Sequence, residues 1–330
     1  MFYHITNAAR YGNIKKDGKV HWKRENGVRI MAYYVAIDIG GTSVKYALAD
    51  ETGRFLDKGE VPTGLPETGI PHLLDLLADI VRRYQARYKV EGVGLDTAGV
   101  VDAERGTILL EARNFPGYTG TGLKAWIEEQ CHVPCAVEND VNAAALGEYW
   151  LGAGKGARSL VCITVGTGIG GALLLDGRLI HGASGSAGEV GYMHIEGGEQ
   201  DLEASARVPW LLETVARAKG IDVTALDGRK VFDLAEQGDG DAEQAIAVML
   251  HRLALGIGNV CCIFNPERIL LGGGIMARQA YIRPRLDAKL ERLVAPALRI
   301  NTTIGFAALG NDAGMIGALR NLLDKVEQKG

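Results

Sequence analysis

The residue types best suited to chemistry stand together in Glu138-Asn139-Asp140, after an apolar run that ends at Val137 and before an alanine-rich stretch. This order predicts a buried strand that leads into a helix, with Asn139 and Asp140 at the junction. Ligands in open α/β sheets bind outside the carboxyl ends of strands, so the junction is a candidate site. The alternative is that Asp140 caps the helix, since Asp is favoured there. Two glycine-rich turns, described next, favour the functional interpretation.

Glycine and threonine lie at the tips of two expected strand pairs, Gly40-Gly41-Thr42 and Gly166-Thr167-Gly168, and a third turn, Gly272-Gly273-Gly274, follows another apolar strand. Because glycine has no Cβ atom, such turns let backbone N–H groups approach a ligand closely, and threonine hydroxyls add donors. These donors suit the oxygens of a polyphosphate. A single glycine tip is more often structural, but two tips at equivalent positions of a repeat indicate phosphate binding.

Asp38 stands just ahead of the first tip, where its carboxylate can hold Mg²⁺ directly or through water. The alternative is that Asp38 caps the turn. Two common nucleotide-binding patterns are missing from the sequence. It has no Gly-x-x-x-x-Gly-Lys-Ser/Thr loop, and Gly168-Ile169-Gly170-Gly171 lies between strands rather than leading into a helix. A P-loop NTPase and a dinucleotide-binding enzyme are therefore disfavoured.

The composition is that of an ordinary globular protein, with 330 residues of which 47% are hydrophobic and 23% charged. The length predicts about two domains. The formal net charge of −4 gives no reason to expect nucleic acid or an anionic membrane as a partner. No uninterrupted apolar run reaches the roughly 18 residues of a membrane span.

The cysteines point to a reducing compartment. The chain has five of them, an odd number, and none forms a Cys-x-x-Cys pair, so we expect reduced thiols and a cytoplasmic location. Cys131, His132 and Cys135 share one loop, but they lack the second ligand pair of a typical zinc site.

Residues 1–30 differ from the remainder of the chain, because they are basic and lack apolar periodicity. We interpret them as an extension that is disordered or was added ahead of a natural start at Met31. A basic arm that binds a partner is the alternative.

Periodicity predicts the order of elements in the folded part. Residues 33–37, 44–49 and 55–61 read as an antiparallel meander, followed by a helix around 73–81, a short strand at 93–95, a loop over 96–102 and a helix over 123–130. Residues 159–165, 169–175 and 178–181 repeat that meander, which implies an internal duplication and two similar half-domains. The further elements expected are helices over 205–219, 229–237, 241–264, 278–293 and 312–326 and strands over 268–271 and 302–307.

Four ordered motifs together resemble the ROK family of sugar kinases and repressors. They are Asp38–Lys45, Glu138–Ala144, Val165–Gly171 and Leu271–Ile275. The resemblance covers about residues 33–325 and implies an α/β protein of the actin-like, hexokinase-like ATPase fold, with two ribonuclease-H-like domains that flank a cleft. The N-terminal domain would comprise residues 31–143 and be joined by the C-terminal helix within 312–330, while residues 144–311 would form the second domain. The family also implies a homodimer.

The resemblance further implies a role for each matched residue. The turns around Gly40-Gly41-Thr42, with Lys45, and around Gly166-Thr167-Gly168 would hold the phosphates of ATP, and Gly272–Gly274 would line the adenosine. Asp140 matches the catalytic base, which would take the proton of a sugar hydroxyl, most plausibly the 6-OH of a hexose or hexoside. The residues that match ligands of the sugar hydroxyls are Asn114, Asn139, Glu189 and Glu203.

One segment departs from the family pattern. The family has a histidine after Gly-Glu-x-Gly and then a cysteine-rich stretch that binds structural zinc. Here Tyr192 holds the histidine position, and Gly197-Gly198-Glu199-Gln200-Asp201 contains no cysteine, so we expect no zinc. His194 is a second candidate to replace the histidine, although its spacing differs.

The sugar therefore stays open among a β-glucoside such as cellobiose, glucose and N-acetylmannosamine. Two other functions remain in view besides an ATP- and Mg²⁺-dependent cytoplasmic sugar kinase. One is a sugar-sensing ROK regulator without catalysis, and the other is an actin-like filament or chaperone ATPase. Neither nucleic acid nor a membrane is expected as a partner.

Overall fold

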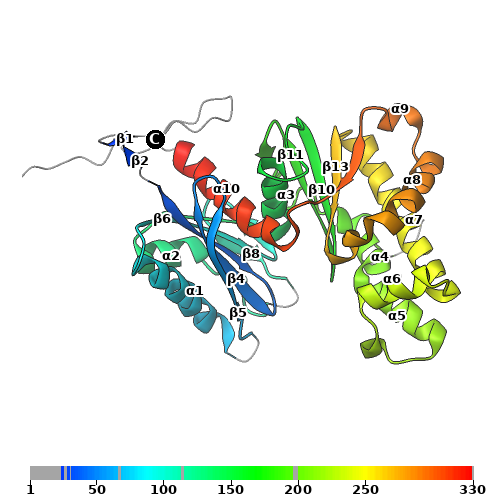
Figure 1. Cartoon of the computed structure of the whole chain (residues 1–330), viewed down its shortest axis with the longest axis horizontal. Coiled ribbons are helices and arrows are strands. Elements are labelled where there is room, and N and C mark those ends of the chain that lie inside the picture. The colour runs from blue at the N-terminus through cyan, green and yellow to red at the C-terminus, as the bar shows by residue number, and fades with distance from the viewer. Residues whose placement is uncertain are drawn as a thin grey trace, which may run out of the picture. The chain divides into compact units, whose positions relative to one another are not determined.

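The computed structural model describes residues 31–65, 68–112, 115–195 and 200–328, and also two short paired strands, β1 (Arg24–Glu25) and β2 (Val28–Arg29). The rest of the predicted N-terminal extension lies outside the described residues. The chain divides into two compact units, of which unit 1 runs to Asp140 and resumes at Ala318, and unit 2 is Val141–Gly317. The chain passes between the units within α3 (Asp140–Trp150) and within α10 (Ala313–Gln328) (Figure 1).

Unit 1 is built on a five-stranded sheet in which the first three strands form an antiparallel meander. The last two strands run parallel to β3. The strand order is β5 (Phe55–Pro62), β4 (Ser43–Asp50), β3 (Tyr33–Ile39), β6 (Val90–Thr97) and β9 (Cys135–Asn139). The meander predicted over 33–61 is confirmed.

Alternation along the strands gives this sheet two different faces. Val35 and Ile37 point into the apolar core beneath α1 (Gly69–Gln85) and α2 (Leu123–Cys131). On the opposite face Ala36 pairs with Gly94, and Gly94 lies directly under Ala318 of α10. Figure 1 shows α1 and α2 on one side of the sheet and the red end of α10 on the other. Small residues on one face thus let a helix approach the backbone closely.

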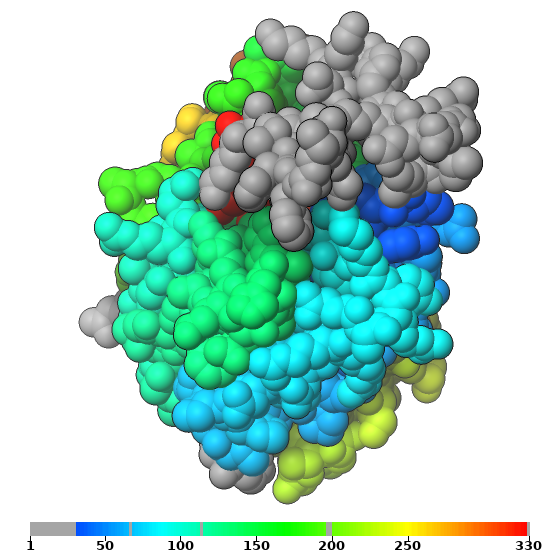
Figure 2. All heavy atoms as spheres, turned by 90° about the vertical axis from the view of Figure 1, so that its left-hand side faces the viewer, coloured from blue at the N-terminus to red at the C-terminus, as the bar shows by residue number. Residues whose placement is uncertain are grey.

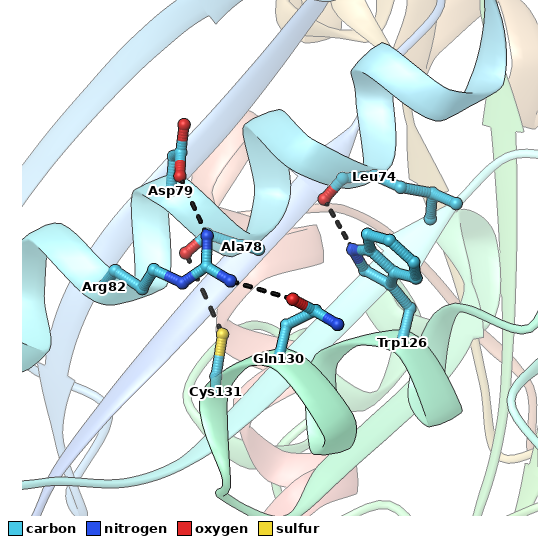
Figure 3. A network of polar contacts seen from close by, with 7 residues as sticks. All are labelled: Leu74, Ala78, Asp79, Arg82, Trp126, Gln130 and Cys131. Carbon is cyan, nitrogen blue, oxygen red and sulfur yellow. Dashed lines mark hydrogen bonds and ion pairs between the residues drawn. The ribbon is translucent and has the colours of Figure 1, made fainter.

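The outer layer of unit 1 is fastened by polar contacts between α1 and α2, whose atoms lie side by side in Figure 2. The Trp126 indole donates to the Leu74 carbonyl over 2.9 Å, and Arg82 donates to Gln130 over 3.0 Å (Figure 3). The Cys131 thiol donates to the Ala78 carbonyl, and burial raises its pKa. A thiol held protonated is a poor metal ligand.

Unit 2 repeats the same sheet, which confirms the predicted duplication. A three-stranded antiparallel meander is again followed by two strands parallel to its first strand. The order is β12 (Arg178–Leu179), β11 (Ile169–Leu175), β10 (Ser159–Val165), β13 (Arg268–Gly272) and β14 (Thr303–Phe306).

Helices cover the sheet of unit 2 and enclose its main core. They are α4 (Leu202–Ala206), α5 (Val208–Lys219), α6 (Gly228–Glu236), α7 (Gly240–Ile263), α8 (Gln279–Leu293) and α9 (Pro296–Arg299), with the 3₁₀ turns η1 (Val190–Tyr192), η2 (Val223–Ala225), η3 (Gly274–Arg278) and η4 (Gly310–Asp312). By length and a mean hydropathy of 1.8, α7 would suffice to cross a membrane. Its inner face instead packs with α4, α5, α6 and α8 in the core of the unit.

Two predictions about elements were wrong. The helix expected over 205–219 is interrupted at Arg207, because Pro209 lies in the first turn of a new helix that begins at Val208 and cannot continue the preceding one. The loop expected over 96–102 is largely strand. Strand β6 extends to Thr97, and β7 (Val100–Asp102) pairs with β8 (Thr107–Leu110). Polar residues in this segment interrupt the apolar alternation by which a strand is recognised in a sequence.

Helices α3 and α10 cross closely within unit 2. A Cβ atom at Gly317 would overlap the carbonyl oxygen of Ala143, so the crossing requires glycine. The fully buried Glu148 of α3 accepts hydrogen bonds from the N–H groups of Ala153, Ala308 and Leu309 at 2.7–2.8 Å. This carboxylate ties the chain that leads into α10 to α3.

Candidate active site

The candidate base lies where β9 ends and α3 begins, as the sequence predicted. The Asn139 side-chain amide donates to the Gly99 carbonyl over 3.0 Å and to Asp140 Oδ1 over 2.9 Å. Gly99 belongs to the turn between β6 and β7, so Asn139 joins that turn to the strand end. One oxygen of the Asp140 carboxylate is thereby fixed in orientation.

Charged residues form a row along one edge of the sheet in unit 1, at the carboxyl ends of β3, β6 and β9 and the amino end of β4. Asp38 of β3 pairs with Lys45 of β4 and with Asp96 of β6, and Asp96 pairs in turn with Glu138 of β9. Residues paired in this way project from the same face of a sheet. Lys45 Nζ lies 3.0 Å from Asp38 Oδ2, so the predicted phosphate ligand and the predicted magnesium ligand form an ion pair.

Asp96 is the member of this row that the sequence analysis missed. It is 0% exposed, and no N–H or hydroxyl group of the described residues donates a hydrogen bond to its carboxylate oxygens, whose direct polar neighbour is the carboxyl group of Asp38. Burial raises its pKa well above the usual range, and the charges of Asp38 and Asp140 raise it further. The available signal was an acidic residue at the end of the apolar run 93–95, just as Asp140 follows the run to Val137.

The first glycine tip is held by the residue that follows β5. The buried Thr63 donates from its hydroxyl to the Gly40 carbonyl over 2.8 Å and from its N–H to the Thr42 carbonyl over 3.0 Å. Gly40 N–H donates to the Ser43 carbonyl over 2.9 Å. The turn is therefore fixed through the carbonyl groups of Gly40 and Thr42 and through the Gly40 N–H, and Thr42 is exposed at its tip.

The second tip is held by the helices that follow it in unit 2. The Glu203 carboxylate of α4 accepts the Ile169 N–H over 2.9 Å, and the Val208 N–H of α5 donates to the Gly166 carbonyl over 2.9 Å. Glu203 was predicted to bind sugar, and here it also supports the turn predicted to bind phosphate.

The third turn meets the second. Gly273 has φ of 103°, and a Cβ atom there would overlap the carbonyl of Val165, the residue before Gly166. Turns 166–168 and 272–274, which the sequence assigned to one nucleotide, are thus neighbours within unit 2.

Glu189 precedes the short turn η1, which ends at Tyr192. Burial raises the pKa of the Glu189 carboxyl, and the nearby charge of Glu203 raises it further. Tyr192 is 68% exposed, and His194 is exposed and forms an isolated bridge with Asp201. Asn114 lies outside the described residues, as do residues 196–199 of the segment from which zinc ligands are missing.

The donor set suits magnesium. Mg²⁺ is usually bound by one or two carboxylates together with waters and substrate phosphates. Asp38 and Asp96 supply two carboxylates beside the first glycine tip. No group of three His, Cys, Asp or Glu side chains suited to a metal occurs in the part of the chain that the structure describes. Substrate phosphates would therefore have to complete the coordination.

Two units with the same strand order define the fold class, which is that of the actin-like ATPases. The chain belongs to the ROK family, and the match covers residues 34–325.

Relatives with assigned activities extend over nearly the whole chain. A glucokinase of Halalkalibacterium halodurans is 32% identical over 86% of this chain and 93% of its own length. A beta-glucoside kinase of Listeria monocytogenes is 30% identical over 88% of this chain and 97% of its own. The structure of a ROK family glucokinase from Streptomyces griseus, in complex with glucose and AMPPNP, superposes with a TM-score of 0.76. It is 28% identical and covers 89% of this chain and 100% of its own.

Proposed function

We propose that this protein is an ATP-dependent sugar kinase in which Asp140 takes the proton of the attacking sugar hydroxyl. The kinase activity follows from membership of the ROK family and from relatives that are glucokinases and beta-glucoside kinases. The role of Asp140 is supported above all by its hydrogen bond from Asn139 at the end of β9.

Phosphoryl transfer requires positioning and charge stabilisation more than covalent chemistry. Asp140 would accept the proton as the hydroxyl oxygen attacks the γ-phosphorus, and a well-placed base contributes roughly 10²–10⁴-fold. The N–H groups of the turns at 40–42 and 166–168, other than those of Gly40 and Gly166, which donate within the turns themselves, would bind phosphate oxygens, with Lys45 as an additional cation. Magnesium, when bound, would neutralise phosphate charge.

The acceptor would be oriented by polar side chains that distinguish one hydroxyl pattern from another. Asn139 and Glu189, with Asn114 and Glu203, are the residues proposed for this role. Glucose, a β-glucoside such as cellobiose and N-acetylmannosamine are the candidates, with transfer to the 6-OH. Tyr192, or alternatively His194, would contact the part of the acceptor that differs between them.

A coupled assay of ADP release over these three sugars, with mannose, fructose and N-acetylglucosamine added, tests the proposal. We expect one of the candidate sugars to give the highest kcat/KM. Sugar binding without ADP release would contradict the kinase and would indicate a sensing regulator.

Replacement of the proposed base gives the sharper test. Asp140→Asn should lower kcat by about 10²–10⁴-fold, because the amide cannot accept the proton. Its Kd for AMPPNP, measured by calorimetry, should change little. The exposed Asp75 of α1 provides a matched control, since Asp75→Asn changes the same charge elsewhere in unit 1. A kcat within threefold of the wild type would rule out Asp140 as the base.

We further propose that the protein is a cytoplasmic homodimer. It would bind no structural zinc and have neither nucleic acid nor a membrane as a partner. Sedimentation velocity in the presence and absence of ATP tests the oligomeric state. A species of twice the mass of the monomer is expected, and polymers that form with ATP would favour a filament-forming ATPase instead.

A further inference from the structure

The fully buried carboxyl group of Asp96 has no role in the proposed phosphoryl transfer. No N–H or hydroxyl group of the described residues donates a hydrogen bond to either of its oxygens, although buried polar groups are almost always hydrogen-bonded, and the side chain that interacts with it directly is another carboxyl group, that of Asp38. It lies beside Asp38 in the sheet, and the charges of Asp38 and Asp140 both act on it. A buried carboxylate in this setting needs either a proton or a cation.

The nearest cation is already engaged. Lys45 forms its ion pair with Asp38. Burial lowers the pKa of Lys45, but the charges of Asp38, Glu60 and Asp96 and the hydrogen bond to Asp38 outweigh burial and raise it. One ammonium group thus faces three carboxylates from neighbouring strands. The negative charge at this sheet edge therefore exceeds the positive charge that these residues supply.

Asp38 makes this group of carboxylates accessible to an ion from solvent. Its side chain is 18% exposed, whereas Asp96, next to it in register, is inaccessible. Of the two side chains, only that of Asp38 is therefore accessible to solvent, and Asp38 stands just ahead of the glycine tip at 40–42. A small ion that prefers oxygen ligands fits such a pair better than an organic cation does.

We propose that Asp96 is a second carboxylate ligand, with Asp38, of the divalent cation that accompanies ATP. The proposal rests on the proposed function, because substrate phosphates would complete the coordination. It also explains why a charged residue is tolerated at a fully buried position: the ion compensates the charge when the site is loaded.

Mn²⁺ binding, followed by electron paramagnetic resonance with AMPPNP present and sugar absent, tests the proposal directly. Asp96→Asn keeps the shape of the side chain and removes its charge, and we expect its Kd for Mn²⁺ to rise about 10–100-fold. Asp75→Asn, the exposed control, should bind Mn²⁺ like the wild type. A Kd for Asp96→Asn within twofold of the wild type would overturn the proposal.

Thermal unfolding supplies a readout that needs neither sugar nor turnover. In EDTA, Asp96→Asn should be more stable than the wild type, because an uncompensated buried acid has been removed. Added Mg²⁺ and AMPPNP should then raise the Tm of the wild type by several degrees more than that of the variant. Equal increases would count against the proposal, and Asp96→Ala provides a second variant if Asp96→Asn folds poorly.

These measurements also separate the two hypotheses. Failure of every sugar to release ADP would refute the proposed function, while the Mn²⁺ titration would still report on Asp96. Conversely, an active kinase in which Asp96→Asn binds Mn²⁺ normally would refute only the metal assignment.

Discussion

At the scale of single residues, the chemistry depends on how each carboxyl group is surrounded. Asp140 is oriented by Asn139, whereas no N–H or hydroxyl group of the described residues donates to Asp96. Glu189 lies between these extremes, because it is partly buried and close to the charge of Glu203. Residues of the same type at similar strand ends can therefore have different roles, which their environments decide.

Glu189 gives a prediction about pH. Its pKa in the folded protein is raised above the ordinary value of 4.5, so the folded state holds this proton more tightly than the unfolded chain. The stability that it contributes is present below about pH 4.5 and is lost as the pH rises through the folded pKa. Glu189→Gln should therefore raise the Tm at pH 8 by about 1–3 °C and leave it unchanged at pH 4.

Thermal denaturation of the sugar-free protein at both pH values measures this difference. Glu213→Gln, at an exposed position of α5, is the control and should show no pH-dependent gain. An equal gain for Glu189→Gln at pH 4 and pH 8 would show that ionisation of Glu189 is not the cause.

At the scale of elements, each glycine turn depends on a neighbour that is distant in sequence. Thr63 holds the turn at 40–42, and Glu203 and Val208 hold the turn at 166–168. The turn at 272–274 is fixed by contact of Gly273 with Val165. The conformation of each turn is therefore determined by contacts with residues distant in the sequence and not by the turn residues alone.

A glycine of the third turn and a glycine outside the proposed ATP site make a matched pair of variants. Gly273→Ala should raise the KM for ATP about 10-fold or more, because φ of 103° is strained for alanine and its Cβ would displace Val165 next to the second turn. Gly240→Ala, in α7 and outside the proposed ATP-binding turns, should leave the KM almost unchanged, since a Cβ there meets no atom within 4 Å. Steady-state kinetics with ATP as the varied substrate measures both KM values. Equal KM values for the two variants would contradict the proposed link between the second and third turns.

At the scale of the whole molecule, α3 and α10 are the two helices that connect the units, because the chain passes from one unit to the other only within them. Their crossing in unit 2 is set by Gly317 against Ala143, and the buried Glu148 holds the segment that leads into α10. The integrity of unit 2 thus depends on a contact between residues more than 150 positions apart in the chain.

Gly317→Ala tests this crossing. Because the added methyl group overlaps a backbone oxygen that cannot move by rotamer change, the substitution should cost about 1–3 kcal/mol and lower the Tm by roughly 2–10 °C. Gly240→Ala, in α7, adds a methyl group that meets nothing within 4 Å and should change the Tm little. Similar Tm values for the two variants would show that the helices can separate without loss of stability.

Much of the fold could be predicted from local patterns. The strands at 159–165 and 169–175 were predicted with their observed bounds, and the repeated meander indicated the duplication from the sequence alone. The prediction of a continuous helix over 205–219 was wrong, because it followed the apolar periodicity of the side chains, whereas Pro209 starts a separate helix in the folded protein.

By itself the sequence determined the two half-domains, the three glycine turns and the position of Asp140 at a strand end. These features depend on the order of residues within short segments, where alternation, glycine and polar strand ends leave a direct signal. Only the tertiary structure placed Asp96 beside Asp38, Glu203 beneath the second turn and Gly317 against Ala143. Each of these pairs joins segments that are far apart in the chain, and burial and charge at such contacts arise only when the sheet and its helices assemble.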